Sequence, residues 1–144
     1  MSLQYKIDGG DFKKAGYASS QIKKRLQKLN IHPKVIKKIV IALYEAEINV
    51  VAYAYDAVIR IEIGNETVKV KIKDNGPGIQ DINQAMEKGY STASSKIREM
   101  GFGAGMGLSN MKKNSDKFDI KSKINEGTEI NIINYRINIK NENN

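Results

Sequence analysis

The sequence contains no cysteine and no long apolar run. The missing thiols exclude disulfide bonds and thiolate metal sites, and they are compatible with a reducing compartment. The apolar runs are much shorter than the roughly 20 residues that cross a bilayer. The N-terminal sequence also lacks the basic and then apolar pattern of a secretion signal. From these absences we expect a soluble, cytoplasmic protein with no membrane partner.

Acidic residues are missing from one long stretch of the chain. Between Phe12 and Tyr44 there are nine lysines and arginines and no aspartate or glutamate, and the whole chain has a formal net charge of +8. The simplest interpretation is a solvated helix surface. A docking surface for an acidic protein is the second. Nucleic acid is the third, because aromatic residues make up only 7% of the chain and are not interleaved with the basic ones.

Two common phosphate-binding motifs are also absent. No Gly-Lys dipeptide occurs, which excludes a P-loop, and no three glycines have the G-x-G-x-x-G spacing of a Rossmann turn. Glycines instead alternate with other residues at Gly101, Gly103, Gly105 and Gly107. Such a run lets backbone N–H groups approach a phosphate closely, and a helix beginning at Met106 would add its N-terminal amides. The pattern predicts an ATP site in a different fold.

A chain of 144 residues suits one domain with a substantial core. We predict a single ATP-binding, kinase-like domain over residues 1–136 and a polar tail, 137–144, that frays. Helical spacing of apolar residues predicts helices within Phe12–Leu29 and from Pro33 to about Tyr55. Shorter helices are expected at 82–87 and 106–114, and strands at Leu3–Ile7, Val58–Ile63, Thr67–Ile72, Phe118–Ile124 and Thr128–Ile133.

The second and third of these strands are predicted to form a hairpin that turns through Gly64 and Asn65. In that register Ile61 faces Val68, so apolar side chains share one face of the hairpin and charged side chains share the other. The hairpin should therefore lie with one face on the core.

Two polar residues fall in the apolar phase of predicted strands. Asp74 continues the inward phase of the third strand, and Thr128 shares the inward phase of the last strand. A carboxylate aimed toward the core is costly without a partner, so Asp74 is a candidate site residue. A strand that has already turned outward at Asn75 is the alternative for Asp74, and an ordinary strand threonine is the alternative for Thr128.

Glu45 and Asn49 are four residues apart on the second predicted helix, which stacks them on one face, while Glu47 points away. An amide oxygen and a carboxylate side by side can divide the work of phosphoryl transfer. Asn49 can hold Mg²⁺ against the phosphates while Glu45 orients and deprotonates the attacking hydroxyl. Taken alone, the pair is better explained by an exposed polar stripe.

Four short segments, taken in order, resemble the sequence boxes of the GHKL superfamily of ATPases and kinases. They are E-A-E-I-N at 45–49, D-N-G-P-G at 74–78, G-x-G-x-G-L at 103–108 and G-T at 127–128. Within that superfamily, the YSTAS and EGTEI segments are similar to those of the anti-sigma regulatory factors, serine/threonine protein kinases that include stress-response switch kinases. The only histidine, His32, precedes Pro33 in a predicted turn, which argues against a phosphoacceptor histidine on a helix.

The resemblance implies a Bergerat ATP-binding fold, an α+β two-layer sandwich whose mostly antiparallel mixed sheet is covered on one face by helices. It implies that Glu45 is the catalytic base and that Asn49 is the ligand of Mg²⁺. The residues that it assigns to nucleotide binding are Asn49, Asp74, Gly76, Gly78, Ile79, Thr92, Gly103, Ala104, Gly105, Met106, Gly107, Leu108 and Thr128. Thr92 lies in the polar segment Gly89–Met100, which we expect to act as a mobile lid.

The resemblance also implies partners. These are ATP and ADP, a small antagonist protein with a phosphorylatable serine, a sigma factor, and a second copy of the chain in a homodimer. The leading hypothesis is an ATP:protein serine kinase that regulates a partner by binding and phosphorylation. A non-catalytic, ATP-gated binding module is the alternative, and Glu45 discriminates between the two because a gated binder needs no base there.

Overall fold

The computed structural model describes residues 1–79, 81–87 and 107–136. The strands are β1 (Ser2–Asp8), β2 (Asp56–Ile63), β3 (Thr67–Asn75), β4 (Lys117–Lys123) and β5 (Gly127–Tyr135). The helices are η1 (Phe12–Lys14), α1 (Tyr17–Gln27), α2 (Pro33–Tyr53), α3 (Ile82–Ala85) and α5 (Gly107–Lys113). The five expected strands are confirmed. The first expected helix is divided at Gly16, whose φ of 90° lies in the left-handed region that favours glycine.

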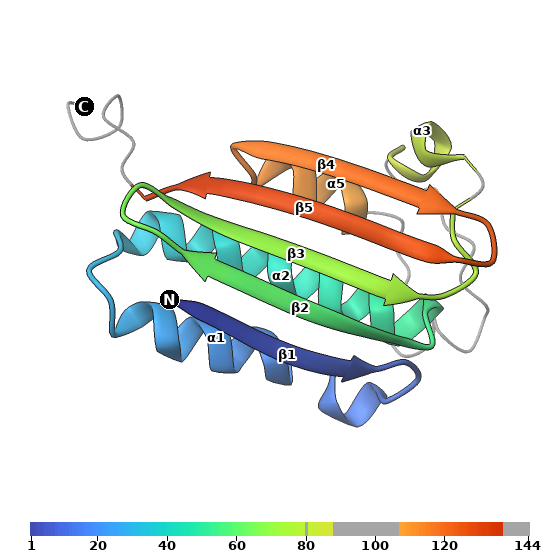
Figure 1. Cartoon of the computed structure of the whole chain (residues 1–144), viewed down its shortest axis with the longest axis horizontal. Coiled ribbons are helices and arrows are strands. Elements are labelled where there is room, and N and C mark those ends of the chain that lie inside the picture. The colour runs from blue at the N-terminus through green and yellow to red at the C-terminus, as the bar shows by residue number, and fades with distance from the viewer. Residues whose placement is uncertain (80, 88–106, 137–144) are drawn as a thin grey trace.

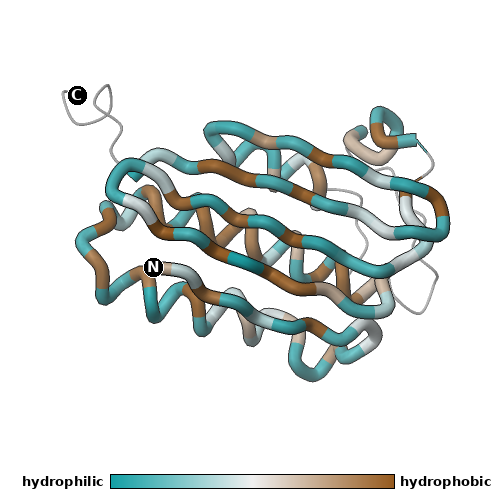
Figure 2. Tube along the Cα trace, viewed as in Figure 1, coloured by the Kyte–Doolittle hydropathy of each residue, from teal (hydrophilic) through white to brown (hydrophobic). Residues whose placement is uncertain are grey.

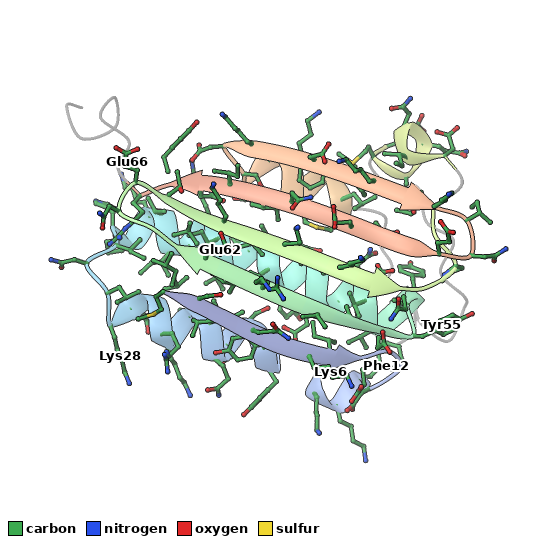
Figure 3. The ribbon with its side chains drawn as sticks, in the orientation of Figure 1. Lys6, Phe12, Lys28, Tyr55, Glu62 and Glu66 are labelled. Atoms are coloured by element: carbon green, nitrogen blue, oxygen red, sulfur yellow. The ribbon has the colours of Figure 1, made fainter. Side chains whose placement is uncertain are left out.

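The strands form one sheet in the order β1-β2-β3-β5-β4, and each neighbouring pair is antiparallel. Helices α1, α2 and α5 lie behind this sheet and leave its front uncovered (Figure 1). The front carries charged, exposed side chains such as Lys6 and Glu62 (Figure 3). The expected α+β two-layer architecture, with helices on one face of the sheet, is therefore confirmed.

The core lies between the helices and the covered face of the sheet. Helix α2 contributes Ile39, Leu43 and Val50, and the central strands contribute Ile59 and Ile72, all of them at most 2% exposed. Figure 2 shows the corresponding alternation of apolar and polar residues along the strands. This alternation follows from the period of two in a strand, which sends every second side chain to the same face.

Helix α2 begins at Pro33, as predicted, because proline at the first helical position needs no hydrogen-bond partner for its nitrogen. His32 is the residue before the helix, and its Nδ1 accepts a hydrogen bond from the Lys34 N–H at 3.1 Å. The interpretation of His32 as a turn residue is confirmed. Although α2 contains 21 residues, none of the helices in the described ranges is both long and apolar enough to cross a membrane.

The predicted register of the β2–β3 hairpin is wrong by two residues. Ile63 pairs with Val68, and the Gly64 N–H donates to the Thr67 carbonyl at 2.9 Å, so the turn residues are Asn65 and Glu66. Gly64 does not adopt the positive φ that a type II′ turn would require. Because a shift of two residues preserves the pleat, the apolar side chains still share one face and the core prediction is unaffected.

Candidate functional site

Asp74 lies near the end of β3, where the apolar side chains of that strand give way to a half-buried carboxyl group. The Thr128 N–H of β5 donates to Asp74 Oδ1 at 3.0 Å, and no described residue donates to Oδ2. Burial raises the pKa of the Asp74 carboxyl above its ordinary value; the bond from Thr128 opposes this rise, and the negative charge of Asp56 adds to it. The inward direction predicted for Asp74 and Thr128 agrees with the structure.

Glycines allow the chain beyond Asp74 to cross the β4–β5 hairpin at close range. Gly127 has a φ of 113°, and a Cβ there would collide with the Asp74 carbonyl. Gly78 has a φ of 79°, and a Cβ there would collide with the Lys123 carbonyl. The Asn125 N–H donates to the Pro77 carbonyl at 2.9 Å across the same crossing. Side chains at either glycine would therefore push the segment away from Thr128.

Ser122 on β4 joins this crossing, although the sequence did not single it out. Its Oγ accepts a hydrogen bond from the Ile79 N–H at 2.7 Å and lies 2.8 Å from Thr128 Oγ1 and 3.2 Å from the Gly127 carbonyl. A signal was present, because Ser122 follows Phe118 and Ile120 in the inward phase of its strand. Ser122 thus ties the end of the D-N-G-P-G segment to Thr128.

Glu45 and Asn49 lie on α2 and are both half-buried. The Asn110 side chain of α5 donates to Glu45 Oε1 at 3.3 Å, and a Cβ built on Gly107 would lie 3.5 Å from Glu45 Oε2. Glu45 therefore faces the start of α5, where the glycine-rich segment ends. No described residue is hydrogen-bonded to the side-chain amide of Asn49.

Glu47 occupies a different face of α2 and is only 2% exposed. It accepts hydrogen bonds from the N–H groups of Gly16, Ala18 and Ser19 at 2.9–3.1 Å and from Ser19 Oγ at 2.7 Å. The prediction that Glu47 points away from Glu45 and Asn49 agrees with this position. Its role as an acceptor at the start of α1 was not predicted.

The predicted site residues within the described ranges form two groups. Asp74, Gly76, Gly78, Ile79 and Thr128 meet at the β4–β5 hairpin, whereas Glu45 and Gly107 meet between α2 and α5. Helix α2 connects the groups. It carries Glu45, and Ala54, the residue that follows the helix, lies 3.2 Å from a Cβ built on Gly76. The Leu108 side chain is buried in the core, so only its backbone could meet a ligand. Thr92, Gly103, Ala104, Gly105 and Met106, together with the lid 89–100 and the tail 137–144, lie outside the described residues.

A family model described as "Histidine kinase-like ATPase domain" matches residues 15–134. The chain belongs to this family. The chain is similar to the serine/threonine-protein kinase RsbT of Bacillus subtilis, with 36% identity over 68% of this chain and 71% of that protein. It is also similar to the anti-sigma F factor of Anoxybacillus flavithermus, with 30% identity over 63% of each chain. A solved structure of the mycobacterial sensor histidine kinase MprB matches 92% of this chain and 97% of that chain with a TM-score of 0.56 at 15% identity.

Two side chains of the predicted site have hydrogen-bonding capacity that no described residue uses. The Asp74 carboxylate offers a free oxygen to a donor, and the Asn49 amide has no partner among the described residues. No cluster of three or more acidic or histidine side chains in the described ranges could hold a metal ion by itself. The side-chain oxygen of Asn49 is a ligand type that Mg²⁺ accepts together with water and substrate phosphates.

Proposed function

We propose that this chain is an ATP-dependent protein serine/threonine kinase that phosphorylates a small antagonist protein and regulates it by binding. The observation that carries the proposal is the position of Glu45. Its carboxylate faces Gly107 at the start of α5 and receives only one hydrogen bond from the described residues, from Asn110 at 3.3 Å. A carboxylate with unused acceptor capacity beside a glycine-rich segment can serve as a general base.

Asp74 and Thr128 would recognise the base of ATP. Asp74 Oδ2 would accept a hydrogen bond from the adenine amino group, while Oδ1 is held by the Thr128 N–H. Thr128 would assist through water. Asn49 would be a ligand of Mg²⁺, which would supply charge stabilisation at the phosphates.

Glu45 would act on the protein substrate. Its carboxylate would accept the proton of the serine hydroxyl as the serine oxygen forms a bond to the γ-phosphorus. The bond between the γ-phosphorus and the β–γ bridging oxygen would break, and ADP would leave with the electron pair of that bond. This role requires no contact between Glu45 and the adenine ring, which agrees with the separation of the Glu45 and Asp74 groups along α2.

The names of the relatives support the protein partners in the proposal. One relative is named as a serine/threonine-protein kinase and others as anti-sigma F factors. By analogy we propose that the partner is an antagonist protein carrying a serine, that a sigma factor is a second partner, and that the active form is a homodimer.

Affinity capture with the purified chain, with and without Mg·ATP, followed by phosphosite mapping of the captured proteins, tests the proposal. We expect a serine to be phosphorylated on a small captured protein only with Mg·ATP. Asn49→Ala should bind ATP with less dependence on Mg²⁺, and calorimetry measures this. ATP binding without any phosphorylated partner would reject the kinase in favour of an ATP-gated binding module.

A further inference from the structure

We propose that Ser122 is a positioning residue that makes this site select adenine over guanine. The proposal rests on the proposed function, because it names a determinant of nucleotide choice at the same site. Ser122 lies on β4, is half-buried, and contacts both the Asp74 side of the site and Thr128.

The hydrogen bonds of Ser122 leave its hydroxyl few options. A serine hydroxyl has one hydrogen and two lone pairs, and the Ile79 N–H already occupies one lone pair at 2.7 Å. The hydrogen can go to Thr128 Oγ1 at 2.8 Å or to the Gly127 carbonyl at 3.2 Å. Either hydroxyl can donate across the 2.8 Å separation, and we assign the donation to Ser122. When Ser122 donates to Thr128, the threonine hydroxyl keeps its own hydrogen for a ligand or a bridging water.

That assignment gives the site an acceptor on Asp74 and a donor on Thr128, two residues joined by the bond from the Thr128 N–H to Asp74 Oδ1 at 3.0 Å. Asp74 Oδ2 is the acceptor, since the Thr128 N–H occupies Oδ1, and the Thr128 hydroxyl is the donor. Adenine presents an amino donor at position 6 beside the acceptor N1, whereas guanine presents the acceptor O6 beside an N1–H donor. The pair therefore matches adenine directly or through water and opposes guanine at both positions.

Ser122 also sets the spacing of this pair. By holding the Ile79 N–H, it fixes the segment that follows Asp74 against the β4–β5 hairpin, on which Thr128 lies. Within the described ranges, a second hydrogen bond joins these two segments, from the Asn125 N–H to the Pro77 carbonyl at 2.9 Å. Loss of Ser122 Oγ would thus change how the Thr128 hydroxyl is oriented, while the Asn125–Pro77 hydrogen bond would still hold the two segments together.

Calorimetric titration of the full chain with ATP and with GTP tests the inference. Ser122→Ala should lose ATP affinity by on the order of three- to tenfold, the value of one hydrogen bond, with little change for GTP, so that the ATP/GTP affinity ratio falls by the same factor. Ser122→Thr retains the hydroxyl on a strand that tolerates threonine and should restore the ratio. Ser115→Ala is the matched control, because it removes a hydroxyl whose acceptor is the Met111 carbonyl on α5.

The outcomes separate this inference from the proposed function. A wild-type chain that does not bind ATP would reject the proposed function itself. Wild-type binding of ATP with an unchanged ATP/GTP ratio in Ser122→Ala would reject only the role of Ser122. An equal loss for both nucleotides would also reject it, since loosening of the fold would weaken them alike; urea unfolding of each variant measures that loosening independently.

Discussion

Helix α2 carries two carboxylates, Glu45 and Glu47, whose surroundings differ sharply. Glu47 is 2% exposed and accepts four hydrogen bonds from the start of α1. Glu45 is half-buried and accepts one, from Asn110 at 3.3 Å. Two residues along a helix correspond to a rotation of about 200°, so the side chains point to nearly opposite sides of α2.

The number of donors around each group distinguishes a structural carboxylate from a chemically available one. A carboxylate has about four acceptor sites, and the three N–H groups and one hydroxyl around Glu47 use that capacity fully. Glu45 keeps most of its capacity and faces Gly107, where no side chain intervenes. Burial alone would have favoured Glu47 as the functional residue, whereas the count of donors favours Glu45.

The strongest effect that we predict is the loss of phosphoryl transfer in Glu45→Ala. Removing a general base should slow transfer to the captured substrate by about 10²–10⁴-fold, while ATP affinity stays within about twofold because the base acts on the attacking hydroxyl. Quantitative phosphosite mass spectrometry over time measures the rate, and calorimetry measures the affinity. A variant that phosphorylates at the wild-type rate would reject Glu45 as the general base.

Glu47→Ala should instead destabilise the fold by about 2–4 kcal/mol, because it leaves buried N–H donors at the start of α1 without an acceptor. Such a loss is a large part of the stability of a domain of this size. Urea unfolding followed by circular dichroism gives the free energy, with Glu45→Ala as the matched control, which should change it by less than about 0.5 kcal/mol. Equal stabilities for the two variants would show that the donor count has no energetic meaning here.

Asp74 is a third carboxylate, and one of its two oxygens has no donor among the described residues. Asp74→Asn tests the role of that oxygen. The amide can still accept from the Thr128 N–H, but its NH₂ would face the adenine amino group, and ATP affinity should fall by about 1–3 kcal/mol. Calorimetry checks this loss. Retained affinity would reject Asp74 as the adenine acceptor.

The raised pKa of Asp74 fixes the direction of two pH effects. Since the folded protein holds this proton more readily than the unfolded chain, the stability associated with Asp74 decreases as pH rises from the ordinary aspartate value through the raised folded value. Asp74→Asn removes that decrease and should be at least as stable as wild type at neutral pH without nucleotide. ATP binding by the wild type should weaken as pH falls through the same window, because the carboxylate is the acceptor. Thermal unfolding and calorimetry across this window measure the two trends.

These three carboxylates also show what the sequence can predict. The alternation of apolar residues placed Asp74 and Thr128 inward because a period of two is preserved even when the hairpin register shifts by two. The helical period likewise separated Glu45 from Glu47. The donors of Glu47 begin at Gly16, 31 residues earlier in the chain, and no local pattern specifies such a contact. Ser122 could be assigned an inward direction, but its bond to Ile79 depends on how two distant segments cross.

The weakest effect that we predict concerns α1, whose first residues donate hydrogen bonds to Glu47. Lys23, Lys24 and Arg25 are exposed on α1, and a hollow of about 450 Å³ between α1 and α2 is lined by residues that include both Lys23 and Glu45. None of its lining residues belongs to the Asp74 group, so it lies apart from the proposed adenine contacts. Its position would let a partner serine approach Glu45 past this basic surface.

Replacing Lys23, Lys24 and Arg25 with glutamate should therefore slow association with an acidic partner by about tenfold at low salt and flatten its salt dependence, because attraction between complementary charges accelerates encounter and is screened by ions. ATP affinity should be unchanged, since the three side chains lie on a different element from Asp74 and Thr128. Stopped-flow association from low to moderate salt measures the rate, and Lys69, Lys71 and Lys73 on the uncovered sheet face provide a control reversal of the same charge. If reversal on the sheet slows association as much as reversal on α1, the partner responds to net charge alone, and the basic stretch is a solvated helix surface.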